Sequence, residues 1–260
     1  MSETGSTPAP GSAESETELE AVTPGAAAPA AGAAPAAGAA SSTLPGWARV
    51  LVVVAHPDDE SFGLGAAISA FTSAGAIVDV LCLTRGEAST LQGVEGDLPT
   101  IREHELRAAA DALGARNVDL RDLPDGGLAG LDPAVPDSEV ERAVAATRPD
   151  GILTFDTTGI SGHPDHVAAT DAAVRVAARR ELPVLAWTLP EEICAQLDDD
   201  GHPGFLGRPM SEIDLILTVD RAAQRAAVGC HPSQAVPGSV LWRRLELQGD
   251  TEHLRWLRRP

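Results

Sequence analysis

The sequence has no lysine and no tyrosine, and aromatic residues make up only 3% of its 260 residues. All 19 basic residues are arginines, against 38 acidic residues, so the formal net charge is -19 at pH 7. Nucleic acids and anionic membranes are bound by basic protein surfaces. The shortage of positive charge therefore argues against a nucleic-acid partner and against membrane binding.

Cysteine is also scarce. Cys82, Cys194 and Cys230 are far apart and odd in number, which argues against a disulfide framework and against a CxxC zinc site. The N-terminus has no basic region before its Ala-rich stretch, and Pro and Gly interrupt that stretch, so we expect neither a signal peptide nor a membrane span. These features predict a reducing, cytoplasmic location, and they leave open whether the chain forms a homo-oligomer.

Large side chains are nearly absent from residues 1–45, which consist almost wholly of Ala, Pro, Gly, Ser, Thr and Glu. Such a segment cannot bury enough apolar surface to offset the entropy cost of ordering. We therefore predict a disordered Ala/Pro/Gly-rich tail over residues 1–45. Residues 46–260 are predicted to form one domain, since their length suits a single α/β core.

Apolar runs alternate with helical patterns from Trp47 onward. The runs predict strands at residues 50–55, 78–83, 118–120, 151–155, 184–189 and 214–219. The stretches between them predict helices at residues 63–74, 100–113, 138–147, 165–180 and 221–229. Continuous apolar strands are typical of a parallel sheet covered on both faces, so the alternation predicts a Rossmann-like, doubly wound α/β fold with a mostly parallel sheet. Ligands of such folds bind beyond the carboxyl ends of the strands, so the loops after the strands are the candidate site.

The loop after the first predicted strand is rich in charge. It contains His56, Asp58, Asp59 and Glu60, and the proline after His56 fixes the turn. Carboxylates at a helix N-terminus are favoured by the helix dipole and by free N–H groups. Taken alone, this stretch is therefore explained equally well as a helix cap beside a surface histidine.

A second loop repeats the pattern. The stretch "GISGHPDHVAA" follows the predicted strand at 151–155 and opens another helix with His163, Asp165 and His166. One such loop alone is also compatible with a capped helix start. Two loops that each supply His and Asp at one edge of a parallel sheet predict instead a His/carboxylate metal site, of the zinc type that keeps positions open for water.

The Gly-rich stretch "FGLGAA" after the first loop partly matches a dinucleotide-binding turn. Ile68 occupies the third glycine position of that motif, and three acidic residues would face the pyrophosphate. These departures argue against dinucleotide binding.

Five motifs lie along residues 50–234. They are "AHPDDE" after the first strand, "TRGE" at 84–87, "REHELRAAADALG" on a helix, "GHPDH" before another helix and "HPSQ" at 231–234. Together they resemble the PIG-L/LmbE family of N-acetylglucosaminyl deacetylases. The combination of AHPDDE with a later HPDH is specific, whereas HPSQ alone is a weak signal.

The resemblance implies a metal site. Its ligands would be His56, Asp59 and His166, and the ion would be zinc. Ferrous iron is the alternative, because His/carboxylate sites accept both ions and availability decides between them.

The resemblance also implies catalytic roles for the neighbouring residues. Asp58 would be the general base, and His163 would assist the tetrahedral intermediate or the leaving amine. Asp165 would orient a histidine. Amide hydrolysis needs this division, because the carbonyl must be polarised, a base must take the water proton and an acid must serve the departing amine.

Arg85, Glu87 and His231 are further candidates, for substrate binding. Arg85 and Glu87 end the second strand beside the predicted site, although a surface ion pair explains them equally well. His231 can reach the pocket from a helix end, and a structural role is an equal alternative. Arg102 and Glu105 share one helical face and are predicted to form a structural ion pair. Three other histidines are predicted to face solvent: His104, His202 and His253.

These features predict a metal-dependent N-deacetylase that removes an acetyl group from an N-acetylglucosaminyl-type amino sugar or conjugate. A metal-dependent hydrolase of another small amide in secondary metabolism is the alternative enzyme, and a catalytically silent metal- or sugar-binding domain is the alternative from another class. The set of Asp58, His163 and Asp165 argues against the silent domain, because a binding site needs no base or acid around its ligands. The loops at 91–99, 123–136 and 190–210 are expected to contact the aglycone, and their composition does not identify it.

Overall fold

The structure, a computed structural model, describes residues 40–89 and 96–260. Seven strands form one sheet. They are β1 (Arg49–Val54), β2 (Ile77–Thr84), β3 (Asn117–Leu123), β4 (Gly151–Phe155), β5 (Val184–Thr188), β6 (Leu215–Thr218) and β7 (Thr251–Arg258).

Helices connect the strands. The α-helices are α1 (Asp59–Phe62), α2 (Gly65–Ser73), α3 (Leu98–Ala112), α4 (Ala134–Thr147), α5 (Gly159–Gly162), α6 (Pro164–Arg180), α7 (Glu191–Asp199), α8 (Ala222–Gly229) and α9 (Val240–Gln248). Two short 3-10 helices are η1 (Leu128–Gly130) and η2 (Met210–Glu212).

The sheet has the strand order β3-β2-β1-β4-β5-β7-β6. Strands β1 to β5 pair in parallel, and β7 runs antiparallel to both β5 and β6. The chain first proceeds outward from β1 to β3 and then restarts at β4 on the other side of β1. This reversal between β1 and β4 is where doubly wound sheets bind their ligands, beyond the carboxyl ends of the strands. The predicted fold class is confirmed.

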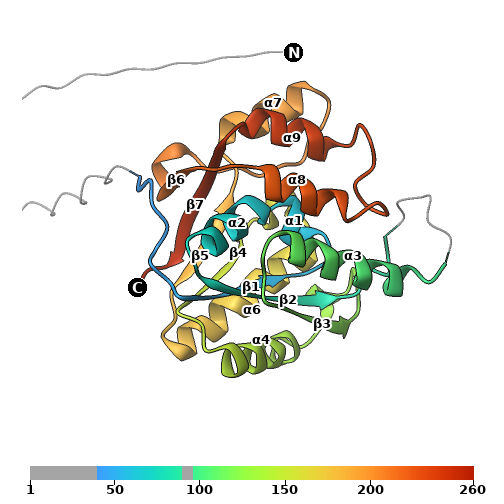
Figure 1. The fold of residues 1–260 in the computed structure, drawn as a ribbon, viewed down its shortest axis with the longest axis vertical. Coiled ribbons are helices and arrows are strands. Elements are labelled where there is room, and N and C mark those ends of the chain that lie inside the picture. The colour runs from blue at the N-terminus through green and yellow to red at the C-terminus, as the bar shows by residue number, and fades with distance from the viewer. Residues whose placement is uncertain (1–39, 90–95) are drawn as a thin grey trace, which may run out of the picture. The chain divides into compact units, whose positions relative to one another are not determined.

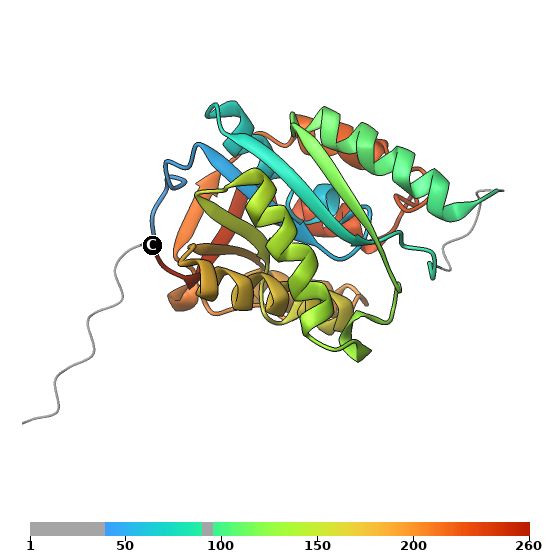
Figure 2. The same cartoon turned by 90° about the horizontal axis from the view of Figure 1, so that it is seen from below.

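Both faces of the sheet are covered by helices. Successive side chains of a strand point to opposite faces, and those of β1 enter two different cores. Val50 and Val52 pack with residues of α2, α3 and α8, whereas Leu51 and Val53 pack with residues of α4 and α6. Figures 1 and 2 show α4 and α6 together on one side of the sheet, with α2 and α3 on the other. Burial on both faces explains why β1 is a continuous apolar run.

Among the elements of eight or more residues, three were not predicted. Helix α7 lies within the predicted 190–210 loop, and α9 and β7 follow the last predicted helix. Strand β7 pairs with β5 and β6 and alternates polar with apolar residues in part of its length. His253 lies on this strand and is buried, so its prediction as a solvent residue was wrong.

The segment before β1 lies against the sheet. Ser41 pairs with Leu215 at the edge of β6, and Leu44 and Trp47 pack against the core, where Trp47 stacks on Phe71. The predicted tail boundary at residue 45 is therefore too late in the chain. Residues 1–39 of that tail, like residues 91–95 of the predicted 91–99 loop, lie outside the described residues.

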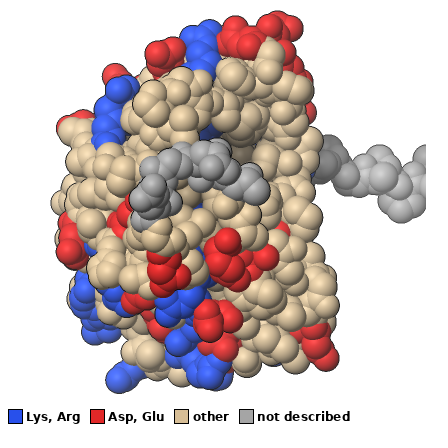
Figure 3. Space-filling view, turned by 90° about the vertical axis from the view of Figure 1, so that its right-hand side faces the viewer, with Lys and Arg blue, Asp and Glu red and all other residues tan. Residues whose placement is uncertain are grey.

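The described surface mixes charges of both signs. On the face shown in Figure 3, arginine side chains lie among Asp and Glu side chains. Exposed ion pairs such as those of Arg179 and Arg180 with Glu141 illustrate this mixing. Within residues 40–89 and 96–260, no helix has the length and apolar character needed to cross a membrane.

Candidate active site

The loop after β1 folds a carboxylate back onto the end of its own strand. The Asp59 Oδ2 atom accepts hydrogen bonds from the backbone N–H groups of Ala55 (3.1 Å) and His56 (2.9 Å). Asp59 is also the first residue of α1, where a carboxylate is favoured. These contacts leave Oδ1 facing the cavity that opens above the strand ends.

The loop after β4 brings two histidines to the same place. His163 caps α6, because its Nδ1 accepts a hydrogen bond from the backbone N–H of Asp165 (3.2 Å), and Pro164 occupies the first turn. His166 lies in that turn and its Nδ1 is 3.0 Å from the carbonyl oxygen of Gly159. Helix capping and functional placement of histidines are therefore combined in one loop.

Candidate ligand atoms of three residues converge between the two loops: one nitrogen each of His56 and His166, and the two carboxylate oxygens of Asp59. His56 Nδ1 lies 3.2 Å from His166 Nε2 and 3.7 Å from Asp59 Oδ2, while His166 Nε2 lies 3.1 Å from Asp59 Oδ1. Nitrogen and oxygen ligands about 2.0–2.1 Å from a tetrahedral zinc ion are about 3.3 Å apart. The spacing and the donor types both fit a divalent metal ion.

The outer nitrogens of the two rings have partners that direct the inner nitrogens toward the site. His56 Nε2 lies 3.1 Å from Asp125 Oδ1 and 3.3 Å from Asp165 Oδ2. His166 has the backbone carbonyl of Gly159 in the equivalent position. If these outer nitrogens carry the protons, the lone pairs of His56 Nδ1 and His166 Nε2 face each other, as metal ligands require.

The charges of the site stabilise a cation. Burial opposes the ionisation of Asp59, but His166 and His56 keep the pKa of its carboxyl well below the usual range. Burial lowers the pKa of His56, but hydrogen bonds to Asp125 and Asp165 together with the charge of Asp59 raise it to about 10. In protein without metal, His56 therefore holds a proton, and a divalent ion would displace that proton.

Asp58 is held differently from Asp59. Its φ of 129° is a conformation that favours glycine, and its backbone N–H donates to Glu60 Oε2 (2.9 Å). Its carboxylate receives a hydrogen bond from Arg102 Nη2 (3.1 Å). Burial raises the pKa of Asp58 to about 6, although Arg102 opposes the rise. Asp58 thus lines the cavity without belonging to the cluster of His56, Asp59 and His166.

His163 stands beside the cluster as a neutral group. Burial and the neighbouring His166 and His56 rings lower its pKa. Its ring centre lies 4.9 Å from that of His56 and 4.8 Å from that of His166. Because Nδ1 accepts the backbone hydrogen bond at the helix cap, the proton of the neutral ring lies on Nε2, where it can be donated.

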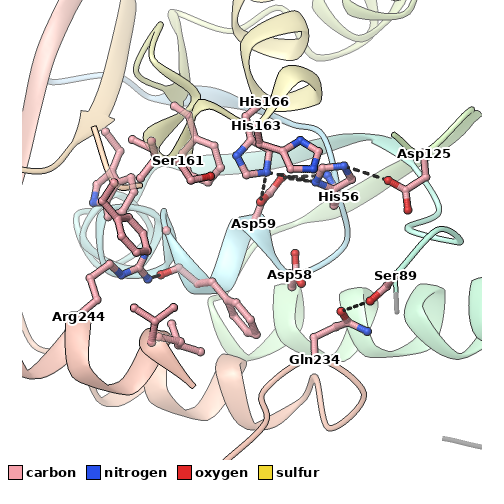
Figure 4. A pocket seen from close by; sticks show the side chains of 18 of the residues that line it. His56, Asp58, Asp59, Ser89, Asp125, Ser161, His163, His166, Gln234 and Arg244 are labelled. Atoms are coloured by element: carbon pink, nitrogen blue, oxygen red, sulfur yellow. Dashed lines mark hydrogen bonds and ion pairs between the residues drawn. The ribbon is translucent and has the colours of Figure 1, made fainter. Parts of the chain in front are cut away.

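His56, Asp58, Asp59, His163 and His166 line one cavity of about 590 Å³, whereas Asp165 is fully buried behind its wall. Figure 4 shows the three histidines grouped above Asp59 and Asp58, with Asp125 to one side and Arg244 on the opposite side. The rest of the wall is largely apolar and includes Phe62, Trp187 and Phe155, whose ring packs against His166. The cavity therefore joins a polar half with acid, base and metal-ligand atoms to an apolar half.

Comparisons with known proteins identify the family of the chain. The sequence profile of the PIG-L family, described as GlcNAc-PI de-N-acetylase, matches residues 51–177. A 1D-myo-inositol 2-acetamido-2-deoxy-alpha-D-glucopyranoside deacetylase from Nakamurella multipartita is 30% identical over 246 residues, covering 74% of this chain and 82% of the relative. The chain belongs to the PIG-L family. The resemblance inferred from the AHPDDE and HPDH motifs is confirmed, and the protein is a member of a family of de-N-acetylases.

Solved structures share the fold of this PIG-L member. Dbv21, the A40926 pseudoaglycone deacetylase, has a TM-score of 0.61 at 23% identity and covers 81% of this chain and 98% of its own. GalB, the 4-carboxy-2-hydroxymuconate hydratase from Pseudomonas putida KT2440, has a TM-score of 0.59 at 19% identity and covers 82% and 97%. Because this fold serves a deacetylase and a hydratase, the reaction depends on the side chains at the site.

Three predicted substrate-binding residues of the PIG-L chain lie outside the cavity wall. Arg85 forms ion pairs with Glu103 and Asp122. Glu87 is exposed, and its carboxylate accepts the backbone N–H of Asp125 (3.0 Å).

His231 is fully buried and lies 2.8 Å from Glu60 Oε1. Because Glu60 in turn binds the backbone of Asp58, His231 supports the AHPDDE loop from behind. Of the two alternatives for this histidine, the structural one matches its position.

Three charged residues of the cavity wall were not assigned to the site from the sequence. Asp125 follows β3, and its only signal was its position after a strand. Arg102 was predicted to pair with Glu105, but it binds Asp58 and the carbonyls of Pro57 and Gly86. The glycine of the TRGE motif, Gly86, was the sequence signal for this arrangement. Only glycine leaves room there for the Arg102 guanidinium, because a Cβ atom at Gly86 would lie 2.1 Å from Arg102 Nη1.

The third missed residue is Arg244. It lies on α9, an element that was not predicted, and no motif marked it.

Proposed function

We propose that this PIG-L member is a divalent-metal-dependent hydrolase that removes the acetyl group from an N-acetylated amino sugar or its conjugate. The observation that carries the proposal is the convergence of His56 Nδ1, His166 Nε2 and the Asp59 carboxylate, with Asp58 beside them and outside the cluster. The amino-sugar substrate class is carried over from the named activity of the Nakamurella relative.

His56, Asp59 and His166 would hold the ion. Zinc is the proposed ion and ferrous iron the alternative, since the donor set suits both. A bound divalent ion would polarise the acetyl carbonyl and lower the pKa of water.

Asp58 is the proposed general base. Its carboxylate takes one proton from the attacking water, whose oxygen forms a bond to the carbonyl carbon. Arg102 fixes the carboxylate, and burial raises its pKa to about 6, so the group can both accept a proton and deliver it. The same proton can then pass to the departing nitrogen as the C–N bond breaks, which leaves acetate and the free amine.

His163 is the proposed oxyanion donor. Its neutral ring presents the Nε2–H to the carbonyl oxygen as that oxygen gains negative charge. Asp165 and Asp125 hold His56 in the orientation that its role as ligand needs.

Acetate release from phenyl N-acetylglucosaminide tests the proposal. We expect turnover by protein loaded with zinc or ferrous iron, and turnover lower by roughly 10²- to 10⁴-fold in Asp58→Asn at the same metal content. A panel of other small N-acetyl amides run in parallel separates the alternative hydrolase. Binding of the glycoside without acetate release from any amide would instead support the silent binding domain.

A further inference from the structure

Arg244 is a buried cation in the apolar half of the cavity. It projects from α9, lines the cavity and is only 7% exposed. Figure 4 shows it across the cavity from Asp125 and Ser89. The catalytic groups of the proposed function do not use it.

No carboxylate pairs with Arg244 among the described residues. A guanidinium has five N–H donors, and only Nη2 is used, on the backbone carbonyl of Phe62. The Nε atom is buried without a partner, and the guanidinium carbon lies 5.0 Å from the centre of the Trp187 ring. The ring stabilises the charge without neutralising it.

The other charged groups nearby are already paired. Arg102, the other arginine on the described cavity wall, binds Asp58. Glu252 would be the natural partner of Arg244, but it binds Arg221 (2.5 Å) and the Trp187 Nε1–H (2.6 Å). Among the residues that the structure describes, none therefore supplies a counter-charge to Arg244.

Burying an unpaired charge is costly, so such a group is expected to find a counter-charge. Burial lowers the pKa of Arg244 to about 10, with Glu252 opposing the change, and the side chain remains cationic at neutral pH. A single guanidinium balances a singly charged carboxylate better than a phosphate dianion, which would add net negative charge to a chain of formal charge -19.

The apolar lining of the cavity indicates which kind of ligand would present a carboxylate to Arg244. Phe62, Phe155, Trp187, Phe205 and Leu241 line the same cavity. Apolar walls with one fixed polar group are typical of sites that recognise an apolar ligand with a single oriented charge.

We propose that Arg244 binds a carboxylate on an apolar, flat aglycone of the substrate, which sits between the aromatic side chains while the acetamido group faces His56, Asp59 and His166. This specificity rests on the proposed deacetylase function, because that function supplies the sugar that links the two halves.

Two product glycosides test the site without turnover. They are 4-carboxyphenyl glucosaminide and its neutral counterpart 4-carbamoylphenyl glucosaminide, titrated by calorimetry into metal-loaded protein. We expect the carboxylate to bind roughly tenfold to 100-fold more tightly, the range of a hydrogen bond to a charged group. Equal affinities in the wild-type protein would overturn the proposal.

Matched variants assign the preference to one side chain. Arg244→Gln keeps a donor for the Phe62 carbonyl but loses the charge, so the affinity ratio should fall to about one. Arg244→Lys keeps the charge and should retain a preference for the carboxylate. Arg243→Gln changes the neighbouring, half-buried arginine, which pairs with Asp200, and should keep the wild-type ratio.

The wild-type ratio persisting in Arg244→Gln would show that another group binds the anion. Thermal melting of each variant identifies loss of folding. If Arg244→Gln does not fold, the affinity ratio measured for Arg244→Lys tests the proposal instead. Loss of the preference in a folded Arg244→Lys, with Arg243→Gln unchanged, would reduce Arg244 to a structural anchor.

Acetate release from the acetylated forms of both glycosides separates this inference from the proposed function. Tighter binding of the carboxylate without acetate release would contradict the proposed deacetylase function and support the Arg244 site. Equal acetate release and equal binding for both glycosides would support the deacetylase function and contradict the Arg244 site.

Discussion

Two adjacent carboxylates have opposite environments at the residue scale. His166 and backbone N–H groups hold Asp59 ionised, whereas burial raises the pKa of Asp58 to about 6. Neighbouring carboxylates whose pKa values are pushed apart commonly divide into different chemical roles. A count of charges in AHPDDE would treat the two as equivalent.

Asp58→Asn and Asp59→Asn should therefore fail in different ways. We expect Asp58→Asn to keep stoichiometric metal and to lose turnover by roughly 10²- to 10⁴-fold, the contribution of general acid-base catalysis. Asp59→Asn removes a charged ligand and should lose the metal on dialysis. Elemental analysis and acetate release measure both. A metal-free Asp58→Asn with a loaded Asp59→Asn would reverse the assignment.

Asp58 also has a backbone that suits glycine, with φ at 129°. Asp58→Gly and Asp58→Ala both remove the carboxylate, but only glycine adopts this conformation without strain. We expect the glycine variant to be more stable than the alanine variant by about 1 kcal/mol, measured by urea unfolding. Arg107, inside α3, is the control site, where the glycine variant should be the less stable one by a similar amount.

At the scale of elements, the sequence predicts β1, β2, β4 and β5 of the parallel part of the sheet well because these strands are buried on both faces. Continuous apolar runs mark β1 and β4, and the polar residues that follow them mark the site. Strand β7 and helix α9 could not be predicted in the same way. Polar and charged residues such as Glu252 and Arg244 are buried in them by ion pairing, stacking and hydrogen bonds from distant elements, and no local pattern indicates those partners.

The segment before β1 is expected to contribute to stability through its contacts at the edge of the sheet. Ser41 exchanges backbone hydrogen bonds with Asp214 (2.7 Å) and Ile216 (2.8 Å), and Leu44 packs on the core. Deleting residues 1–39 should leave the melting temperature nearly unchanged, because their composition offers little to bury. Deleting residues 1–45 should lower it by several degrees. Equal melting temperatures for the two truncations would show that this edge contact contributes nothing.

At the scale of the whole molecule, the site lies where the strand order reverses between β1 and β4. His56 and Asp59 come from the β1 loop, and His166 comes from the start of α6. The two halves of the doubly wound sheet thus each supply part of the ligand set. A metal ion bound there would join the halves, so metal binding and folding should be thermodynamically linked.

Chelation should consequently lower both activity and stability. A ligand that binds only the folded state stabilises it by about 2.7 kcal/mol at 100 times its dissociation constant, which corresponds to roughly 5–10 °C for a domain of this size. We expect a chelator to abolish acetate release and lower the melting temperature by this amount, and added zinc or ferrous iron to restore both. Asp59→Asn should melt at one temperature with or without the ion, because its ligand set is incomplete. Full turnover by protein that elemental analysis finds free of metal would contradict the proposed role of His56, Asp59 and His166, since the remaining residues of the cavity would then suffice for hydrolysis.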